Sequence, residues 1–395
     1  MDFDQQWLLW ALPIAFALGW LARGWDARQR RRELEGSQKV LHQGLNFLLN
    51  EQHDKAIDAF IAAVQQDPGT SELHLALGNL FRRRGEYERA VRVHQHVLGR
   101  ADLSQADRDR AQHGLAQDYL KAGLFDRAEA AFQALAGTAF DTESRLALLD
   151  LHERSRDWKA AVAVAEQLEK SGTGSFASRI AHYWCELALE ADAAGQHDAA
   201  DDALARAREA APGDARPLVL AGELAARHDR HGDALRVWNT LMAVRPAAFN
   251  LVAQRYATSA QAAGDTAGAL IRLQALYEKA PTLELLQAIA ALQPDVDARQ
   301  GKLLAHLREH LTLAAAQALL AAPGGAAAND SAPGATGAGL AAAATVAVRD
   351  AVKRAARPLH RYRCAACGFE AEHYFWQCPG CLGWDTYPPQ RLEDL

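Results

Sequence analysis

The chain has 395 residues, of which 49% are hydrophobic and 7% aromatic, and its formal net charge is −6. This length predicts two or three modules with a large core, and the mild acidity argues against a dedicated nucleic-acid-binding protein, whose binding domain is usually basic. The scarcity of aromatic residues favours closely packed helices over sheets. Four of the five cysteines lie between positions 364 and 381, which excludes a disulfide framework spread along the chain and indicates one local site.

Residues 1–25 are predicted to form a single transmembrane anchor. The run from Trp7 to Ala22 is uncharged and apolar, and tryptophans lie at both of its ends, as is typical of membrane interfaces. No lysine or arginine precedes this run, whereas arginines are concentrated in the basic juxtamembrane segment that follows it, over residues 26–36. By the positive-inside rule the N-terminus lies outside and the body of the chain lies in the cytoplasm. A cleaved signal peptide and a buried helix of a soluble domain are the alternatives.

Residues 37–320 are predicted to form a solenoid of helix pairs, so the fold class is all-α. Small and apolar residues recur at matching offsets about every 34 residues. Two clear sets are Gly44, Ala56, Phe60, Ala63 and Pro68, and Gly222, Ala234, Trp238, Leu241 and Pro246. The pattern resembles the superhelical tetratricopeptide repeat (TPR), in which a small residue on the first helix of a pair lets the second helix approach. An unrelated α-helical bundle is the alternative.

The repeat pattern predicts seven units over residues 37–281, with insertions at 99–109 and 171–178. Residues 283–320 are expected to be degenerate repeats or a capping helix. A solenoid of this kind binds its partners on the concave face that the first helices line. Projection of the repeat places six polar or basic side chains toward that groove: Asn79, Arg82, Arg83, Arg110, Gln117 and Lys121. They suit an extended acidic or carboxylate-bearing peptide, and a solvated arginine face is the alternative.

Residues 321–345 are almost entirely alanine, glycine and proline and are predicted to be a flexible linker. A short helix over about 345–356 is expected to follow it, at the start of the C-terminal module 346–395.

The C-terminal module carries two Cys-x-x-Cys pairs, Cys364 with Cys367 and Cys378 with Cys381. Each pair makes a tight turn that presents two thiolates, so the spacing predicts one metal ion held by four sulfurs. Zn²⁺ and iron both accept four thiolates. Zinc would stabilise a segment too short to fold alone, whereas iron would make the module an electron carrier. Seven aromatic residues are expected to form a small core around the site or to dock the module onto the solenoid: Tyr362, Phe369, Tyr374, Phe375, Trp376, Trp384 and Tyr387.

Other residues of metal-binding or nucleophilic type have simpler interpretations. Cys185 lies in a predicted helix and is expected to be a small buried residue. His306 and His310 are four residues apart and are expected to lie on a solvated helix face. No combination of nucleophile and base stands out, so the chain is not expected to be an enzyme.

The combination of anchor, repeats and ending resembles one family over essentially the whole chain. The ending from Tyr362 to Pro389 reads YRCAACGFEAEHYFWQCPGCLGWDTYPP and is similar to rubredoxin-like metal ribbons. Together with the N-terminal apolar run and the TPR pattern, it resembles the lipopolysaccharide assembly protein B family of Gram-negative bacteria (LapB, also called YciM). The linker at 321–345 is longer and lower in complexity than this resemblance leads us to expect.

The resemblance implies a non-catalytic adaptor at the bacterial inner membrane, with a periplasmic N-terminus and a cytoplasmic body. Such an adaptor promotes degradation of the deacetylase LpxC by the membrane AAA+ protease FtsH, and a membrane sensor (PbgA, also called LapC) antagonises it. On this chain the anchor would meet the protease and sensor within the lipid bilayer, and the repeats would hold the deacetylase. The alternatives are a generic TPR assembly scaffold and a rubredoxin-like iron electron-transfer protein. The sequence leaves open whether the chain forms a homodimer.

Overall fold

The computed structural model describes residues 71–293, 295–321 and 337–394, together with Arg23, Phe47, Lys55, Ala59 and Ile61. The predicted anchor, the basic segment 26–36, the first helix pair and residues 322–336 of the linker therefore lie almost wholly outside the described residues. Among the residues that are described, no helix is both long and apolar enough to cross a bilayer.

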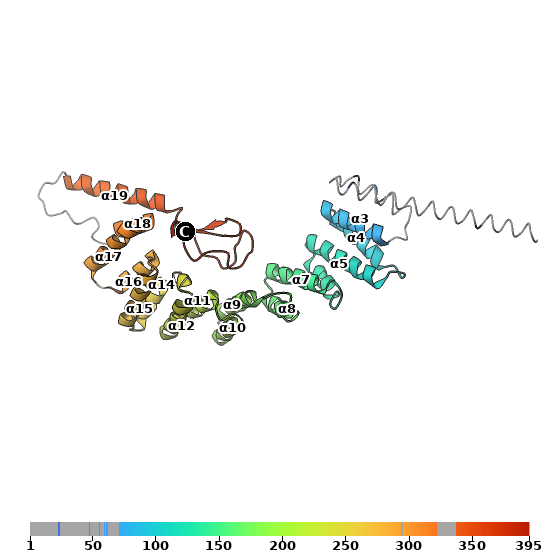
Figure 1. The fold of residues 1–395 in the computed structure, drawn as a ribbon, viewed down its shortest axis with the longest axis horizontal. Helices are drawn as coiled ribbons and strands as arrows, with labels where there is room; N and C mark the ends of the chain where they lie inside the picture. Colours follow the sequence, from blue (N-terminus) through green and yellow to red (C-terminus); the bar gives the residue numbers. More distant parts are fainter. Residues whose placement is uncertain are drawn as a thin grey trace, which may run out of the picture. The chain divides into compact units, whose positions relative to one another are not determined.

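The chain divides into two compact units, residues 1–160 and 161–395, each built from helices that follow one another in pairs (Figure 1). The helices of the first unit are α3 (Ser71–Arg84), α4 (Tyr87–Leu98), α5 (Gln105–Lys121), α6 (Phe125–Gln133) and α7 (Asp141–Ser155). Helix α8 (Trp158–Lys170) crosses the boundary between the units. The predicted helix pairs are confirmed from residue 71 onward, and the described residues between 71 and 321 form helices with no strand, as the all-α prediction requires of the solenoid.

The second unit continues the same pattern, and three further helices follow its repeats. Its repeat helices are α9 (Ala177–Ala193), α10 (His197–Ala210), α11 (Ala215–Arg227), α12 (His231–Val244), α14 (Ala253–Ala262) and α15 (Thr266–Lys279), with the short α13 (Pro246–Phe249) before α14. Helices α16 (Leu283–Leu292), α17 (Val296–Glu309) and α18 (Leu313–Ala321) occupy the region expected to hold degenerate repeats or a cap.

The helix pairs are held together by the small residues that the sequence pattern identifies. In the second unit, the indole of Trp238 on α12 is fully buried and lies directly over Gly222 on α11. In the first unit, the ring of His94 on α4 lies between Gly78 and Gly114, so a histidine occupies the place that Trp238 takes in the later repeat. A Cβ at any of these glycines would overlap the ring, which is why the close approach of the helices requires glycine.

The helix turns follow from local chemistry at their ends. Gly123 ends α5 with a φ of 75°, a left-handed conformation that glycine adopts without steric cost. The Ser104 side chain accepts a hydrogen bond from the backbone N–H of Asp107 and so caps the start of α5. Of the predicted insertion 99–109, residues 99–104 form the turn and the remainder is the first turn of α5.

The linker prediction needs a correction at its C-terminal end. Helix α19 (Gly337–Ala356) begins eight residues before the helix expected from position 345, so residues 337–345 are helical. Alanine dominates this stretch and has the highest helix propensity, which outweighs its low complexity. Helix α19 packs on α18 and so lies within the second unit.

Two of the simpler predictions have different outcomes. Cys185 is completely buried on α9, as expected, and burial raises the pKa of its thiol to about 12. The solvated face predicted for His306 is wrong, because its side chain is only 4% exposed and its Nδ1 lies 2.7 Å from the Tyr277 hydroxyl. Tyr277 of α15 packs against this face, which the periodicity of α17 alone does not reveal.

Candidate functional site

The four predicted metal ligands lie on two similar turns of the C-terminal module. Strands β1 (Tyr362–Arg363) and β2 (Glu370–Ala371) pair antiparallel and bracket the first turn. Within that turn the backbone N–H of Gly368 donates to the Cys364 carbonyl at 2.9 Å, and Gly368 has a φ of 77°. The second turn repeats this arrangement, since the N–H of Leu382 donates to the Cys378 carbonyl at 2.8 Å and Leu382 has a φ of 59°. Each turn is a knuckle that directs two sulfurs to one point.

The sulfur positions fit one tetrahedral metal ion. The Cys364 and Cys381 Sγ atoms are 3.9 Å apart, and the Cys367 and Cys378 Sγ atoms are 3.7 Å apart. All four ligand atoms lie within 4.8 Å of one another. A zinc–sulfur bond of about 2.3 Å places tetrahedral sulfurs about 3.8 Å apart, so the sulfurs are already at the spacing of a metal site.

The surroundings of Cys364 and Cys378 favour the thiolate form that a metal requires, whereas desolvation and hydrogen bonds with the other three thiols raise the pKa of Cys367 to about 12. Desolvation opposes ionisation of Cys364, but hydrogen bonds from the Thr386 side chain and from the backbone amides of Ala366 and Cys367 outweigh it and lower its pKa to about 6. Backbone amides in the second knuckle likewise lower the pKa of Cys378 against its desolvation. These residues would hold one ion, which would join the two knuckles through its bonds to sulfur.

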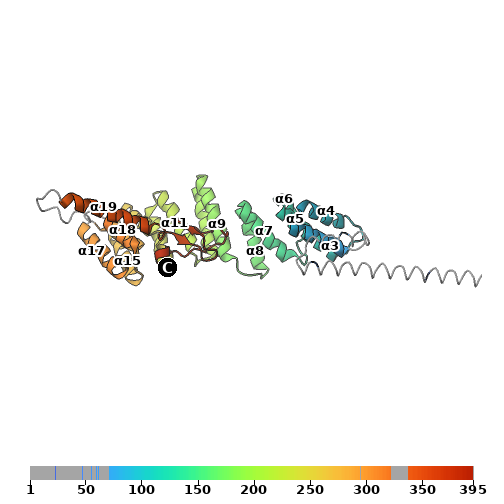
Figure 2. The same cartoon turned by 90° about the horizontal axis from the view of Figure 1, so that it is seen from above.

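The module packs on the helices of the second unit, and its aromatic residues divide between this contact and a core of the module's own. Figures 1 and 2 both place the module alongside α9 and α11. Tyr362 and Tyr387 are buried with Cys364 and Cys378 in a small core of the module itself. Trp376 instead packs against the core of the second unit. Phe369 and Phe375 remain exposed. The prediction of a small aromatic core and that of docking are therefore both confirmed, for different residues.

The docking centres on a buried histidine of α9. The imidazole of His182 is 1% exposed and stacks on the Trp384 indole, with ring centres 4.6 Å apart and planes inclined by 15°. His182 Nε2 lies 2.6 Å from a carboxylate oxygen of Asp385. Arg216 of α11 is buried, pairs with Glu186, and lies 5.3 Å from the centre of the Trp384 ring. Because Arg216 donates to His182 Nδ1, the arrangement fits the tautomer with hydrogen on Nε2, which donates to Asp385.

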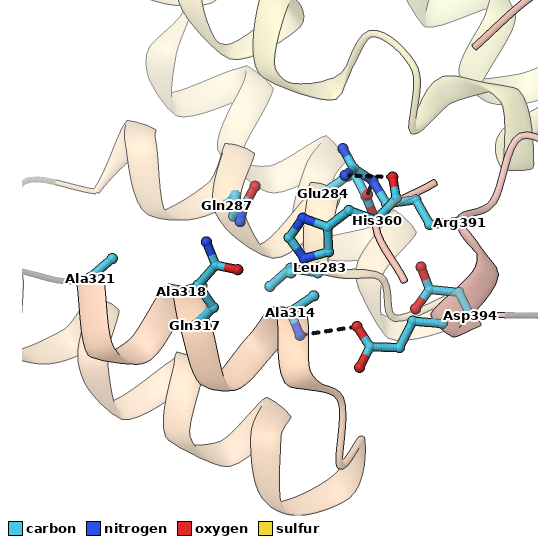
Figure 3. A pocket seen from close by; sticks show the side chains of 11 residues that line it. Leu283, Glu284, Gln287, Ala314, Gln317, Ala318, Ala321, His360, Arg391 and Asp394 are labelled. Carbon is cyan, nitrogen blue, oxygen red and sulfur yellow. Dashed lines mark hydrogen bonds and ion pairs between the residues drawn. The ribbon is translucent and has the colours of Figure 1, made fainter. Parts of the chain in front are cut away.

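The last residues of the chain form a second attachment. Arg391 donates to the Glu284 carboxylate of α16 at 3.1 Å and to the His360 carbonyl at 3.3 Å. The Glu393 carboxylate, from the 3₁₀ turn η1 (Leu392–Asp394), accepts from the first backbone amides of α18, including that of Ala314 at 3.0 Å. Figure 3 shows these groups around a pocket of about 320 Å³ between α16, α18 and the tail. The Glu393 carboxylate caps the N-terminal, positive end of α18 and thereby attaches the last residues of the chain to this helix.

The six predicted groove residues all belong to the first unit, on α3 and α5. Arg82 is turned inward, because its guanidinium donates to Asp118 at 2.8 Å, to the Gly114 carbonyl at 3.2 Å and to Asn79 at 2.6 Å. Arg110 lies at the start of α5 and pairs with Asp107. The remaining three have different exposures: Gln117 is half-buried, and Arg83 and Lys121 are exposed. Within the described part of the chain, neither Arg83 nor Lys121 forms an ion pair.

The sequence reasoning missed a buried polar network beneath these residues. The Asp118 carboxylate is completely buried and bridges His94 Nδ1, at 2.5 Å, and the Arg82 guanidinium. Two features indicate this network. His94 occupies the repeat position at which an aromatic residue is expected, and Asp118 lies on the buried side of α5. A buried carboxylate requires partners of opposite charge or hydrogen-bond donors, so Arg82 serves the internal packing of α3 on α5.

Comparisons with known proteins agree with this architecture. The rubredoxin metal binding domain profile, a zinc ribbon named for LapB, matches residues 362–388, and a tetratricopeptide repeat profile matches residues 73–109. Lipopolysaccharide assembly protein B of Escherichia coli (strain K12) is 32% identical over 388 residues, which cover 97% of each chain. The protein of the same name from Haemophilus influenzae is 26% identical and covers 97% of this chain and 98% of its own length. Since the likeness to the Escherichia coli protein runs through both the repeats and the metal module, the chain belongs to the lipopolysaccharide assembly protein B family.

Proposed function

We propose that this chain is a membrane-anchored, non-catalytic adaptor that takes part in lipopolysaccharide assembly by promoting the degradation of the deacetylase LpxC by the protease FtsH. The observation that carries the proposal is the match to lipopolysaccharide assembly protein B over 97% of the chain, which includes both the helix pairs and the metal module. A protein of this kind needs surfaces that bind partners and has no need of an active site.

The two units differ in how much of their binding surface is available. In the second unit, residues on the first helices of successive pairs, such as His182 on α9 and Arg216 on α11, are already occupied by the metal module. In the first unit the corresponding helices are α3, α5 and α7. Of the residues predicted to bind a partner there, Arg83 and Lys121 are exposed basic side chains, whereas Arg82 and Arg110 are engaged with carboxylates of the chain. We therefore assign recognition of an acidic segment of the deacetylase to the first unit, through Arg83 and Lys121.

The anchor supplies the second part of the proposal. The apolar run from Trp7 to Ala22, followed by arginines, supports a single span in the bacterial inner membrane with a periplasmic N-terminus and a cytoplasmic body. A membrane-bound protease and a soluble substrate that are held by one anchored chain meet at a raised effective concentration. The membrane sensor PbgA, within the same bilayer, would compete with the protease for this anchor and restrain degradation.

The metal module is assigned a structural role with zinc as its ion. The match of the module to a zinc ribbon supports zinc over iron-based electron transfer. A structural zinc contributes folding free energy to a short segment that has only a small core of its own.

Controlled depletion of the protein in its own host tests the adaptor function. We expect LpxC to accumulate, as measured by immunoblot, and its half-life after arrest of translation to lengthen. An unchanged half-life would refute the adaptor proposal. Complementation with the double variant R83E/K121E should fail to restore degradation, whereas K159E, which reverses an exposed lysine on α8, should restore it. Full restoration by R83E/K121E would refute only the assignment of the binding surface.

A further inference from the structure

A second group of metal-binding side chains lies in the solenoid, at the turns between helices. Asp192 is near the end of α9, His197 is the first residue of α10, and His228 directly follows α11. One donor atom from each of the three lies within 4.8 Å of the other two. All three residues belong to the second unit, and they come from two consecutive helix pairs.

The distances are close to those of a metal-bound triad. One oxygen of Asp192, Oδ1, is 2.6 Å from His228 Nε2 and 3.6 Å from His197 Nδ1. The two imidazole rings have their centres 4.0 Å apart. Ligands about 2.0–2.1 Å from a tetrahedral zinc ion lie about 3.3 Å from one another, so His228 Nε2 would need to move by less than about 1 Å from Asp192. Such a movement is within reach of a side-chain rotation and leaves the helices in place.

The carboxylate that joins the two histidines is held in one orientation. The Asp192 side chain is only 8% exposed, and its other oxygen, Oδ2, accepts a hydrogen bond from Arg227 at 2.6 Å. The hydrogen bond from His228 and the charge of Arg227 keep the pKa of Asp192 below its ordinary value, so the carboxylate is ionised. Arg227 thus positions the carboxylate from the side away from the histidines, as outer-shell partners do in metal sites.

The exposure of the three side chains gives an ion access to the site. His197 is 50% exposed and His228 is 27% exposed, whereas Asp192 lies beneath them. Two imidazoles and one carboxylate are a donor set that suits Zn²⁺ and its neighbours in the first transition series. This set differs from the four thiolates of the C-terminal module, so the two sites would be distinguishable by their ligands.

We propose that Asp192, His197 and His228 bind one Zn²⁺-type divalent ion that joins two consecutive repeats of the second unit. The ion takes one oxygen and two imidazole nitrogens from the chain and leaves a coordination position open to water. Its binding ties the end of α9 and the start of α10 to the end of α11, and it therefore stiffens the stretch of solenoid on which the metal module is docked. This site is independent of the partner surface assigned to the first unit.

Calorimetric titration of the full-length protein in detergent tests the proposal. The protein is first loaded with one equivalent of zinc, which the four thiolates take, and is then titrated with further Zn²⁺. We expect a second event with a stoichiometry of one, together with a zinc-dependent rise in the unfolding temperature. H197A and H228A should each weaken this event by about tenfold or more, because each removes one of three ligands.

Two features make the outcome decisive. The side chain of His197 is half exposed, so H197A removes a ligand without disturbing the core. H231A is the matched control, since His231 begins α12, close after His228 in the same turn, and contacts Ser259 and Asp229 instead of the triad. Loss of the second event in H197A and H228A but not in H231A supports the site. A wild-type protein that binds a single zinc ion, or a second event that persists in H197A and H228A, would overturn it.

Discussion

Replacing Gly222 by alanine would place a methyl group against the indole of Trp238. The added Cβ would lie 2.7 Å from Cδ1 of the ring and closer still to Nε1 and Cε2, and the indole has no room to retreat because it is completely buried. Displacing the ring would also break the hydrogen bond from Nε1 to the Val219 carbonyl, which is 3.3 Å long.

The expected change in the free energy of unfolding combines one stabilising effect and two destabilising effects. Alanine improves the helix propensity of the site by about 1 kcal/mol relative to glycine. Overpacking of a tight core costs about 1–3 kcal/mol, and loss of the indole hydrogen bond costs about 1 kcal/mol. The net destabilisation of G222A is therefore about 1–3 kcal/mol, and it should lower the unfolding temperature by roughly 3–10 °C.

A matched substitution separates packing from propensity. Gly301 lies within α17, is exposed, and has no atom within 4 Å of the position that a Cβ would take. G301A should therefore stabilise the protein by up to about 1 kcal/mol, opposite in sign to G222A. Thermal unfolding of the full-length protein in detergent measures both changes, and hydrogen exchange locates them. If G222A were as stable as the wild type, or if exchange in α11 and α12 did not accelerate, the packing explanation would be wrong.

Three further predictions concern the second unit. W384A should loosen the metal module by about 1–3 kcal/mol, seen as faster hydrogen exchange in residues 362–388, whereas F375A, on an exposed ring, should not. Chelation of the bound metal should expose residues 362–388 to proteases while the helical circular dichroism signal persists, and added zinc should restore protection. A visible iron spectrum in the purified protein would contradict the assignment of zinc. Burial and the nearby charge of His310 lower the pKa of His306 below 6.5, so the folded chain binds fewer protons than the unfolded chain and loses stability as the pH falls below 6.5. H306Q should reduce that loss in pH-dependent thermal unfolding, and a loss as steep as in the wild type would contradict this explanation.

Part of the fold and the metal site could be read from local patterns. The helix pairs follow from a repeat in which glycine and alanine mark the closest contacts between helices, and Gly222 with Trp238 is one such contact. The four cysteines were identified because two short turns of fixed spacing are sufficient to define a tetrahedral site. Both features depend on residues that are close together in the sequence, or on one spacing repeated many times.

Features that depend on distant residues were not predictable in the same way. Asp385 and His182 are separated by 203 positions, and only the folded chain brings them within 2.6 Å. For the same reason Arg82, which a repeat projection assigns to the groove, is turned toward Asp118 of the next helix pair. A periodic pattern states which face of a helix is polar, but it does not state which neighbour will neutralise a charge on that face.

The amino-acid sequence alone therefore predicts the repeat architecture and the four cysteines of the candidate metal site, because both are encoded by spacing along the chain, and its ending carries the family resemblance. The folded structure adds the attachment of the metal module to α9 and α11, the tail that caps α18, and the triad of Asp192, His197 and His228. Each of these depends on side chains from separate helices meeting in space. Such meetings are set by the way one helix pair packs on the next, and the sequence of a single repeat does not contain that information.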